Sequence, residues 1–350
     1  MNEQFRVEGD QEGNGHSDVG TPRVALLIVN YNAGAMLLEC LAHVKQQTWS
    51  ALRVIVLDND SQDGSLELAE VQFPCFEYVR LGYNSGFAVA NNRGIVLADD
   101  CDWIACLNPD AFPEPEWVAA LMEVGARQPE YAFLGSLMVS ADNPAVLDGT
   151  GDVYHVSGAA WRQNFHTPWT SVQYAWSHVR EIFGPCAAAA LYRRDALVAV
   201  GGFDERFFCY FEDVDLAFRL RLKGYRSAYV PTARVRHKGS AITGYQSDFT
   251  IYHGYRNLEW TFFKNMPGLL LLLYLPQHLL LFMVSIAVYA WRGKGRVMLK
   301  AKRDALFGLP AIWRDRTRSH VRATTLLRVM RRGVLAPYAD RWRGSYRDRT

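Results

Sequence analysis

The sequence predicts an α/β fold in which a mostly parallel sheet is flanked by helices. Through the first half of the chain, short apolar runs alternate with segments whose apolar residues recur at helical spacing. This alternation is typical of parallel strands joined by crossover helices. The length of 350 residues and the hydrophobic content of 49% are sufficient for one large core or two modest ones.

The first four predicted strands are apolar runs that stop at turn-forming polar residues. They cover residues 23–29, 52–57, 76–81 and 103–107. The helices predicted between them cover residues 36–47, 65–71 and 88–98. Ligands of such sheets bind beyond the carboxyl ends of the strands. This chain places four polar side chains there, namely Asn32, Asp58, Asn84 and Asp110.

The second half of the chain is predicted to be less regular. Its predicted helices cover residues 117–125, 195–200 and 214–223, and its predicted strands cover residues 182–191 and 229–235. Between residues 149 and 176, scattered Trp, Gly and His predict an irregular segment that lies over the ligand site.

The six cysteines predict buried free thiols in a reducing compartment. They stand at positions 40, 75, 101, 106, 186 and 209 without Cys-x-x-Cys pairs, and several lie inside apolar runs. Residues 1–22 are polar and acidic, which predicts a flexible N-terminal segment without the apolar region of a secretory signal. We therefore expect the body of the protein to stay in the cytoplasm.

The net charge of +2 hides an asymmetry along the chain. Residues 1–291 hold 21 Lys and Arg against 32 Asp and Glu, whereas residues 292–350 hold 17 against 4. The two parts therefore carry net charges of −11 and +13. A basic tail can attract nucleic acid, but no recognised nucleic-acid-binding module accompanies this one, so we expect no nucleic-acid partner.

Residues 266–291 contain the longest apolar stretch, which Pro276 interrupts. A membrane-spanning helix needs roughly 20 apolar residues, so a single span, a monotopic attachment and a buried soluble helix all stay open. A single span would send the basic tail to the far side of the membrane, against the positive-inside tendency. We favour monotopic attachment, either by two arms of a re-entrant hairpin broken at Pro276 or by interfacial helices. The basic tail would then meet anionic lipid head groups.

Two acidic clusters carry the chemistry that the residues suggest. Asp110, in Asn108-Pro109-Asp110, follows a predicted strand and could ligate a hard cation that holds a diphosphate, although this tripeptide is also an ordinary turn. The sequence Glu212-Asp213-Val214-Asp215 follows five residues that include four aromatics. Acids there could simply cap a helix, but a partly dry aromatic pocket raises carboxylate pKa values toward the range of a general base.

Two further segments are weaker candidates. His237 ends a predicted strand and could be a neutral imidazole ligand for the same metal, or a structural histidine. Arg234, Arg236 and Lys238 beside it could hold a diphosphate or form a solvated face. Residues 84–94 form a polar turn entering a helix, where N–H groups attract phosphate and amides can contact a base or ribose.

Taken in order, these segments resemble glycosyltransferase family 2 enzymes of the GT-A type, a Rossmann-like fold, and more closely their rhamnosyltransferase-like branch. The resemblance covers roughly residues 24–240. It rests on Ile28-Val29-Asn30-Tyr31-Asn32, Leu57 through Ser65, Asn84 through Gly94, Asn108-Pro109-Asp110-Ala111, and Gly201-Gly202-Phe203-Asp204-Glu205 leading into Phe211 through Asp215.

The resemblance implies an inverting sugar transfer assisted by a divalent metal, Mg²⁺ or Mn²⁺. Asp213 matches the catalytic base, with Glu212 and Asp215 as the other candidates, and Asp110 and His237 match metal ligands. The nucleotide-sugar contacts expected are Asn30, Tyr31, Asn32, Asp58, Asn59, Asp60, Asn84, Gly86, Asn91 and Asn108. One departure is that the Asp-x-Asp common in the wider family is Asn-Pro-Asp here, so metal affinity would rest more on the diphosphate and His237.

The resemblance, the apolar stretch and the basic tail together predict three regions. Residues 1–22 precede a glycosyltransferase domain at 23–262, whose nucleotide-binding half is 23–125 and whose acceptor-binding half is 126–262, and residues 263–350 form the membrane-associated helices and basic tail. The expected donor is dTDP-L-rhamnose, and the expected acceptor is a saccharide or lipid-linked saccharide of the cell surface, met at the cytoplasmic face of the cell membrane. A UDP-hexose donor and a non-catalytic nucleotide-sugar-binding scaffold are the alternatives.

A nucleotidyltransferase and a dinucleotide-dependent oxidoreductase fit the sequence less well. The loop after the first strand, residues 30–34, lacks the Lys or Arg that a triphosphate needs. The same loop lacks the Gly-x-Gly-x-x-Gly of dinucleotide-binding proteins.

Overall fold

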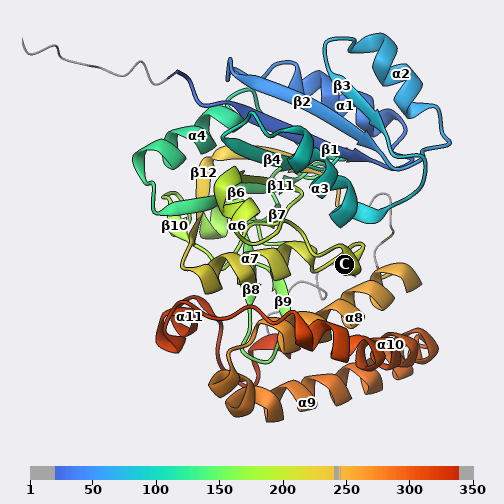
Figure 1. Ribbon diagram of the computed structural model, residues 1–350, viewed down its shortest axis with the longest axis vertical. Coiled ribbons are helices and arrows are strands. Elements are labelled where there is room, and N and C mark those ends of the chain that lie inside the picture. Colours follow the sequence, from blue (N-terminus) through green and yellow to red (C-terminus); the bar gives the residue numbers. More distant parts are fainter. Residues whose placement is uncertain (1–19, 240–243, 245, 339–350) are drawn as a thin grey trace, which may run out of the picture.

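The computed structural model describes residues 20–239, 244 and 246–338, and it shows a sheet covered on both faces by helices, above a separate helical layer (Figure 1). The predicted N-terminal segment and the end of the basic tail lie largely outside the described residues. The ten-stranded sheet runs in the order β10-β12-β6-β11-β4-β1-β2-β3, with β5 paired to β12 and β7 paired to β6. A second sheet is the hairpin β8-β9.

The strands are β1 (Val24–Asn30), β2 (Leu52–Asp58), β3 (Glu77–Arg80), β4 (Trp103–Leu107), β5 (Ala111–Pro113), β6 (Tyr131–Ser140), β7 (Leu147–Gly149), β8 (Asp152–Tyr154), β9 (Ala160–Arg162), β10 (Arg180–Glu181), β11 (Ala189–Arg193) and β12 (Arg226–His237). The helices are α1 (Ala35–Val44), α2 (Ser65–Gln72), α3 (Gly86–Leu97), α4 (Trp117–Arg127), α5 (Trp169–Val172), α6 (Arg194–Ala199), α7 (Glu212–Lys223), α8 (Asp248–Asn265), α9 (Gly268–Trp291), α10 (Gly295–Arg314) and α11 (Ala323–Val329), with a 3₁₀ turn at Glu205–Phe207.

The predicted parallel core is confirmed. Strands β1 to β4 are parallel where they pair, and the register sets Asn30 beside Asp58 at their carboxyl ends. Side chains of β1 alternate between two cores, because Leu27 packs with residues of α3 while Leu26 packs with residues of α1 and α4. Helices on both faces explain why these strands read as continuous apolar runs.

The second half of the sheet differs from the sequence prediction in two places. A strand was predicted at residues 182–191, but the ladder is confined to β10 and β11, and Pro185 between them has no N–H to donate. The ten-residue strand β6 was not predicted, although it lies between β12 and β11 in the sheet. Strand β12 pairs with β6 on one side and with β5 on the other, which sets His237 opposite Ala111.

The C-terminal layer consists of α8, α9, α10 and α11 below the sheet in Figure 1. The boundary predicted after residue 262 falls inside α8. A break at Pro276 was also predicted, and the re-entrant hairpin is wrong because α9 continues through this residue. Pro276 lies on the exposed side of α9, while Leu271 and His278 on the other side are buried, so packing holds both halves in line.

A buried ionic cluster ties this layer together. Glu259 of α8 accepts hydrogen bonds from His278 of α9 at 2.7 Å and from Lys302 of α10. The other ring nitrogen of His278 lies 2.9 Å from the carbonyl oxygen of Ser157, in the turn of the β8-β9 hairpin. The same cluster therefore joins three helices to the hairpin.

The close packing of α7 on the β10–β11 connection can be tested at Gly184. A Cβ added there would lie 2.4 Å from the Cβ of Ala217, so Gly184→Ala should destabilise the fold by about 1–3 kcal/mol through overpacking. Urea unfolding followed by circular dichroism measures this. Gly254→Ala in α8 is the matched control, because nothing lies within 4 Å of its added Cβ, and it should be neutral or stabilising. Equal stability of both variants would contradict the packing described.

Candidate active site

A hydrogen-bonded group of polar side chains closes the carboxyl ends of β1 and β2. The buried amide of Asn30 donates to Asp58 Oδ1 at 2.8 Å and lies 3.0 Å from each of the hydroxyls of Ser61 and Ser65. The backbone N–H of Ser61 donates to the second oxygen of Asp58 at 3.0 Å. Both carboxylate oxygens of Asp58 are therefore fixed in the loop that the sequence assigned to the nucleotide.

The neighbouring loop residues present their side chains differently. Asn32 has a left-handed φ of 50° and accepts a 2.7 Å hydrogen bond from the N–H of Gln62, which ties the two loops together. Tyr31 and Asp60 are exposed. Of the predicted nucleotide contacts in these loops, a ligand can thus reach the exposed side chains of Tyr31 and Asp60, and the amide nitrogen of the exposed Asn32, without breaking this network.

The start of α3 is already satisfied within the protein. The N–H of Ser85 donates to Asn59, the N–H of Gly86 donates to Asn84, and the N–H groups of Phe87 and Ala88 both point at the carbonyl oxygen of Phe208. None of these four N–H groups is therefore free to make the phosphate contact that the sequence predicts here.

Gly86 and Asn91 have packing roles in the same helix. Gly86 has φ +81° and lies so close to Phe208 that an added Cβ would be 2.5 Å from the ring. Asn91 is buried and donates to the carbonyl oxygen of Phe87. Asn108 is half-buried, and its N–H donates to the carbonyl oxygen of Ala188 at 2.9 Å, which anchors the loop after β4.

The structure brings Asp110 and His237 together from distant parts of the chain. Both are buried, and His237 Nε2 lies 3.3 Å from Asp110 Oδ1. His237 Nδ1 lies 2.8 Å from Asp148, whose carboxylate also pairs with Arg162. Burial alone would lower the pKa of His237, but the carboxylates of Asp148 and Asp110 raise it to about 9.

This pair fits a hard divalent cation on two observations. His237 Nε2 is buried without a hydrogen-bond partner in the described part of the chain, and it faces a carboxylate oxygen at a distance suited to two ligands of one ion. Asp148 on the far side of the ring would orient the imidazole, as carboxylates commonly do for metal-bound histidines. Across the described residues no group of three or more His, Cys, Asp or Glu has metal-binding geometry. At this site Asp148 faces Nδ1, the opposite nitrogen of His237, and so is not a third ligand. Further ligands would have to come from the substrate or water.

The three acids at the start of α7 lie in different environments. Asp213 is half-buried and accepts hydrogen bonds from the N–H groups of Ala187 and Val214 at 3.1 and 2.8 Å. Burial raises its pKa above the usual value for aspartate. Among these acids it is the one that combines access with a raised pKa, which suits a group that accepts a proton.

Glu212 and Asp215 are both buried, and each differs from Asp213. Glu212 has an oxygen without a partner in the described part of the chain, and burial together with the Asp213 carboxylate raises its pKa well above the usual range. Asp215 is fully buried and accepts hydrogen bonds from Arg219, Lys264 and Asn265 at 2.7, 2.9 and 2.7 Å. Burial opposes its ionisation, but Lys264 and Arg219 hold its pKa below the usual value.

Three residues of the site were not singled out from the sequence, namely Asp148, Asp152 and Arg162. Asp152 and Arg162 belong to the segment predicted to be irregular, and Asp148 directly precedes it. Strands β7, β8 and β9 bring the three side chains to the same place. Arg162 pairs with Asp148, and its charge also lowers the pKa of Asp213. Asp152 is buried, and burial followed by the Asp213 charge raises its pKa well above the usual value. In the sequence, the signal that could have identified this part of the site was the pair of acids, Asp148 and Asp152, on either side of Gly149-Thr150-Gly151.

Comparison with known proteins gives a consistent picture. The model of the family described as "Glycosyl transferase family 2" matches residues 25–201. The N-acetylglucosaminyl-diphospho-decaprenol L-rhamnosyltransferase of Mycobacterium tuberculosis is 32% identical over 249 residues, which cover 64% of this chain and 78% of the relative.

Two solved structures share the fold. The mannosyltransferase PcManGT from Pyrobaculum calidifontis, in complex with GDP-Man and Mn²⁺, superposes with a TM-score of 0.52 at 17% identity, over 95% of this chain and 89% of that one. GalNAc-T7 with UDP, GalNAc and Mn²⁺ gives a TM-score of 0.53 at 14% identity, over 68% of this chain and 47% of that one.

The buried Asp215 network predicts a stability change with a definite pH dependence. Asp215→Asn leaves Lys264 and Arg219 without their buried anion and should cost about 3–5 kcal/mol of unfolding free energy at pH 7. A lowered pKa contributes stability above the unfolded-state value, near 4, and loses it as the pH falls below that value. The wild-type advantage should therefore shrink on acidification.

Urea unfolding at pH 7 and at pH 3.5 measures both effects. Asp195→Asn is the control, because this carboxylate is 67% exposed and pairs with Arg193 at the surface, where a pair contributes little. An advantage of the wild type that is small at pH 7, or that grows in acid, would show that Asp215 is not ionised in the fold.

Proposed function

We propose that this chain, which belongs to glycosyltransferase family 2 and is therefore a glycosyltransferase, transfers L-rhamnose from dTDP-L-rhamnose to a lipid-linked saccharide in cell-surface polysaccharide synthesis. The resemblance and the GT-A type fold expected from the sequence are both confirmed by the family match and the solved neighbours. The name of the M. tuberculosis relative, a rhamnosyltransferase with a diphospho-decaprenol acceptor, supports this choice of donor and acceptor.

The observation that carries the catalytic proposal is the accessibility of Asp213. It is the half-buried acid of its cluster, and its partner Ala187 precedes Ala188, which binds the N–H of Asn108. The proposed base thus lies one short segment away from the loop that carries Asp110. Base and diphosphate-holding loop on the same edge of the sheet are what a direct displacement at a sugar carbon requires.

The reaction that we propose is an inverting displacement. An acceptor hydroxyl attacks the anomeric carbon, a new C–O bond forms as the bond to the diphosphate breaks, and Asp213 accepts the hydroxyl proton. The nucleoside diphosphate leaves with the bonding electrons. Glu212 and Asp152, with pKa values raised by burial, would stay protonated beside Asp213 and so would not compete for that proton.

Asp110 and His237 would hold the divalent metal, Mg²⁺ or Mn²⁺. When bound, such an ion neutralises charge on the departing diphosphate. Both solved neighbours are described with Mn²⁺ and a nucleotide or nucleotide sugar, which supports this proposal. Asp58 would hold the loop at residues 30–32 in place through its hydrogen bonds to Asn30 and Ser61, and the exposed side chains Tyr31, Asn32 and Asp60 would contact the nucleoside.

We also propose that the protein attaches to the cytoplasmic face of the cell membrane through α9 and α10. Helix α9 is long and apolar enough to cross a membrane by length and composition. One side of it is packed on the protein through Leu271, His278 and Leu281, whereas Leu272 and Leu279 on the other side are 72% and 51% exposed. A helix held along its length in this way favours an interfacial position over a span.

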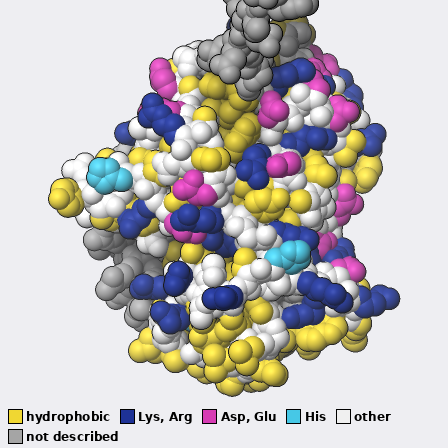
Figure 2. Space-filling view, turned by 60° about the vertical axis from the view of Figure 1, so that its left-hand side comes forward, with side chains coloured by type: hydrophobic (Ala, Val, Ile, Leu, Met, Phe, Trp, Pro, Cys, Tyr) yellow, Lys and Arg dark blue, Asp and Glu magenta, His cyan; other side chains and the backbone are white. Residues whose placement is uncertain are grey.

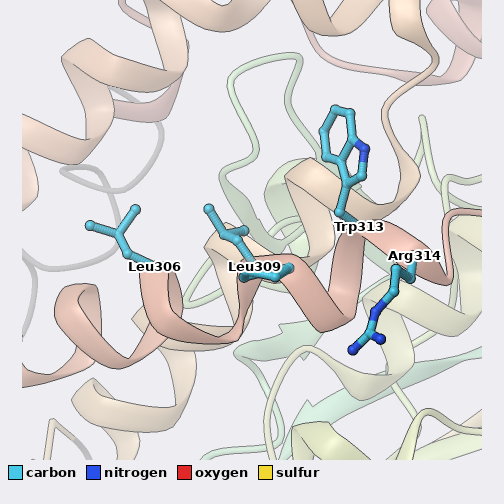
Figure 3. A pocket seen from close by; sticks show the side chains of 5 residues that line it. Leu306, Leu309, Trp313 and Arg314 are labelled. Atoms are coloured by element: carbon cyan, nitrogen blue, oxygen red, sulfur yellow. The ribbon is translucent and has the colours of Figure 1, made fainter.

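Side chains around α9 match a lipid surface. Figure 2 shows hydrophobic side chains gathered at the lower end of the molecule, with Lys and Arg above them. Helix α10 adds an apolar hollow of about 540 Å³ lined by Leu306, Leu309, Pro310, Trp313 and Arg314. Figure 3 shows Leu306, Leu309 and Trp313 projecting from one side of this helix. Apolar side chains bordered by cations suit a membrane with anionic head groups, and such a surface would keep a lipid-linked acceptor close to the enzyme.

Donor turnover by detergent-solubilised protein tests the reaction. With membrane extract as acceptor source, dTDP-rhamnose should yield dTDP in the presence of Mg²⁺ or Mn²⁺, and UDP-glucose, UDP-galactose and UDP-N-acetylglucosamine should not yield UDP. Asp213→Asn should lower kcat by about 10²–10⁴-fold through loss of the base. The kcat should fall on the acid side with a midpoint above 3.8, because burial raises the pKa of Asp213.

Asp99→Asn, at an exposed position after α3, is the control and should keep full activity. Release of UDP from a UDP-sugar, without release of dTDP from dTDP-rhamnose, would support the same mechanism with a UDP-hexose as the donor. Nucleotide-sugar binding without turnover, unchanged in Asp213→Asn, would support the scaffold and contradict the transferase.

Vesicle binding tests the membrane surface. The double variant Leu272→Glu and Leu279→Glu places two charges on the outer side of α9, and it should weaken binding to anionic vesicles by at least about tenfold, since each exposed Leu would lose about 1.5 kcal/mol or more of transfer free energy. Cosedimentation measures the bound fraction. Val71→Glu, at a position on α2 that is 80% exposed, is the control. Wild-type protein that stays wholly unbound in the absence of detergent would refute this attachment.

A further inference from the structure

We infer that helix α8 positions the proposed catalytic base, and that Asn257 is the positioning residue through which it acts. This inference rests on the proposed role of Asp213. It is carried by the contacts between α8 and the segment before α7, residues 207–211, which we call the base loop.

The base loop holds an unusual backbone conformation. Phe208, Tyr210 and Phe211 have φ values of 66°, 67° and 68°. Bulky L-residues seldom adopt this left-handed region, because Cβ approaches the backbone too closely. Strain of this kind persists where the surroundings impose it, and it gathers at functional sites. Phe211 immediately precedes α7, so the loop conformation sets where α7 begins and with it the position of Asp213, its second residue.

Asn257 supplies the hydrogen bonds that hold this loop. It is fully buried in α8, and its Nδ2 lies 2.9, 3.0 and 2.6 Å from the carbonyl oxygens of Phe207, Cys209 and Tyr210. Its own Oδ1 accepts a 2.9 Å hydrogen bond from Arg256 Nε. The amide thus presents its donor side to the base loop and its acceptor side to a cation, an arrangement that neither Asp nor Leu can reproduce.

A second set of contacts with the base loop comes from Arg256, the residue before Asn257 in α8. Arg256 donates to the carbonyl oxygens of Arg206 and Phe207 at 3.1 and 3.0 Å. The carbonyl of Phe208 is turned toward the start of α3 and accepts the 2.7 Å hydrogen bond from Phe87. The turned peptides of the loop therefore bridge α3 and α8.

The far end of the same α7 turn is bound by α8 as well. Lys264 and Asn265 both hydrogen-bond the buried carboxylate of Asp215, two residues beyond Asp213. Helix α8 therefore holds the chain on both sides of Asp213, while among the described residues the Asp213 carboxylate hydrogen-bonds Ala187 and Val214 and not α8. Because these hydrogen bonds come from α8, the C-terminal helical layer supplies part of the placement of Asp213.

Variants of Asn257 separate positioning from mere folding. Asn257→Leu removes every hydrogen bond at similar volume, and Asn257→Asp keeps the shape while removing the donor. A misplacement of about 1 Å in a catalytic group can cost about 10²-fold in rate, so we expect kcat to fall by about 10- to 100-fold. Affinity for dTDP, measured calorimetrically, should be unchanged because the loops at residues 30–32 and 58–65 are untouched.

Thr261→Val is the matched control, because Thr261 is buried one turn further along α8 and its hydroxyl has no partner in the described part of the chain. It should keep the wild-type kcat and dTDP affinity. Hydrogen–deuterium exchange of residues 207–214 is read in parallel, and it should be faster in both Asn257 variants than in wild type and in Thr261→Val.

The exchange measurement does not depend on sugar transfer, so it also decides the inference if the proposed function fails. The inference is overturned if either folded Asn257 variant keeps wild-type kcat and wild-type exchange of the base loop. It is also overturned if dTDP affinity and kcat fall together, and both decreases match the fraction of the variant protein that is unfolded. Failure of wild-type turnover with normal dTDP binding would instead count against the proposed function alone.

Discussion

The buried carboxylate of Asp215 is the interaction on which the arrangement of this protein depends. An isolated charge could not be removed from water at this depth, and here Lys264, Arg219 and Asn265 compensate it. Lys264 also binds Asp204, in the turn before the base loop. One lysine of α8 thereby joins α7 and that turn, and with them the sheet and the helical layer.

The helical period then determines what the neighbouring acids can do. Glu212 and Asp215 are three residues apart and share the inward side of α7, whereas Asp213 is turned about 100° away from Glu212 and is half-buried. The same turn of helix thus contains a buried acid whose pKa is raised well above its usual value, a half-buried acid with a raised pKa and a buried acid with a lowered pKa. Of the three, Asp213 is the acid that a substrate can meet, because the side chains of Glu212 and Asp215 are buried.

The sequence predicted the parallel half of the fold well, since β1 to β4 each combine an apolar run with a polar stop. It did not predict β6, because Gly135 and Ser136 divide the apolar run of residues 131–140 into two short pieces, and a glycine inside a strand weakens it. The continuity of α9 through Pro276 was missed for a related reason. Local propensity favours a break there, and tertiary packing of Leu271 and His278 outweighs it.

The candidate site shows the same division between local and distant information. Asp110, Asp213 and His237 were found because each stands at the end of a recognisable element. Asp148 and Arg162 were missed because they lie on β7 and β9, two short strands that come close to His237 only in the folded protein. Asn257 could not have been found from its own surroundings in α8, since its partners are backbone carbonyls about fifty residues earlier.

The most direct measurement of the central claim is a crystal structure with dTDP and Mn²⁺ bound. The account predicts the metal between Asp110 and His237 Nε2, the diphosphate on the metal, and Asp213 facing the vacant sugar position. A metal bound elsewhere, or a diphosphate away from the carboxyl ends of β1, β2 and β4, would contradict it.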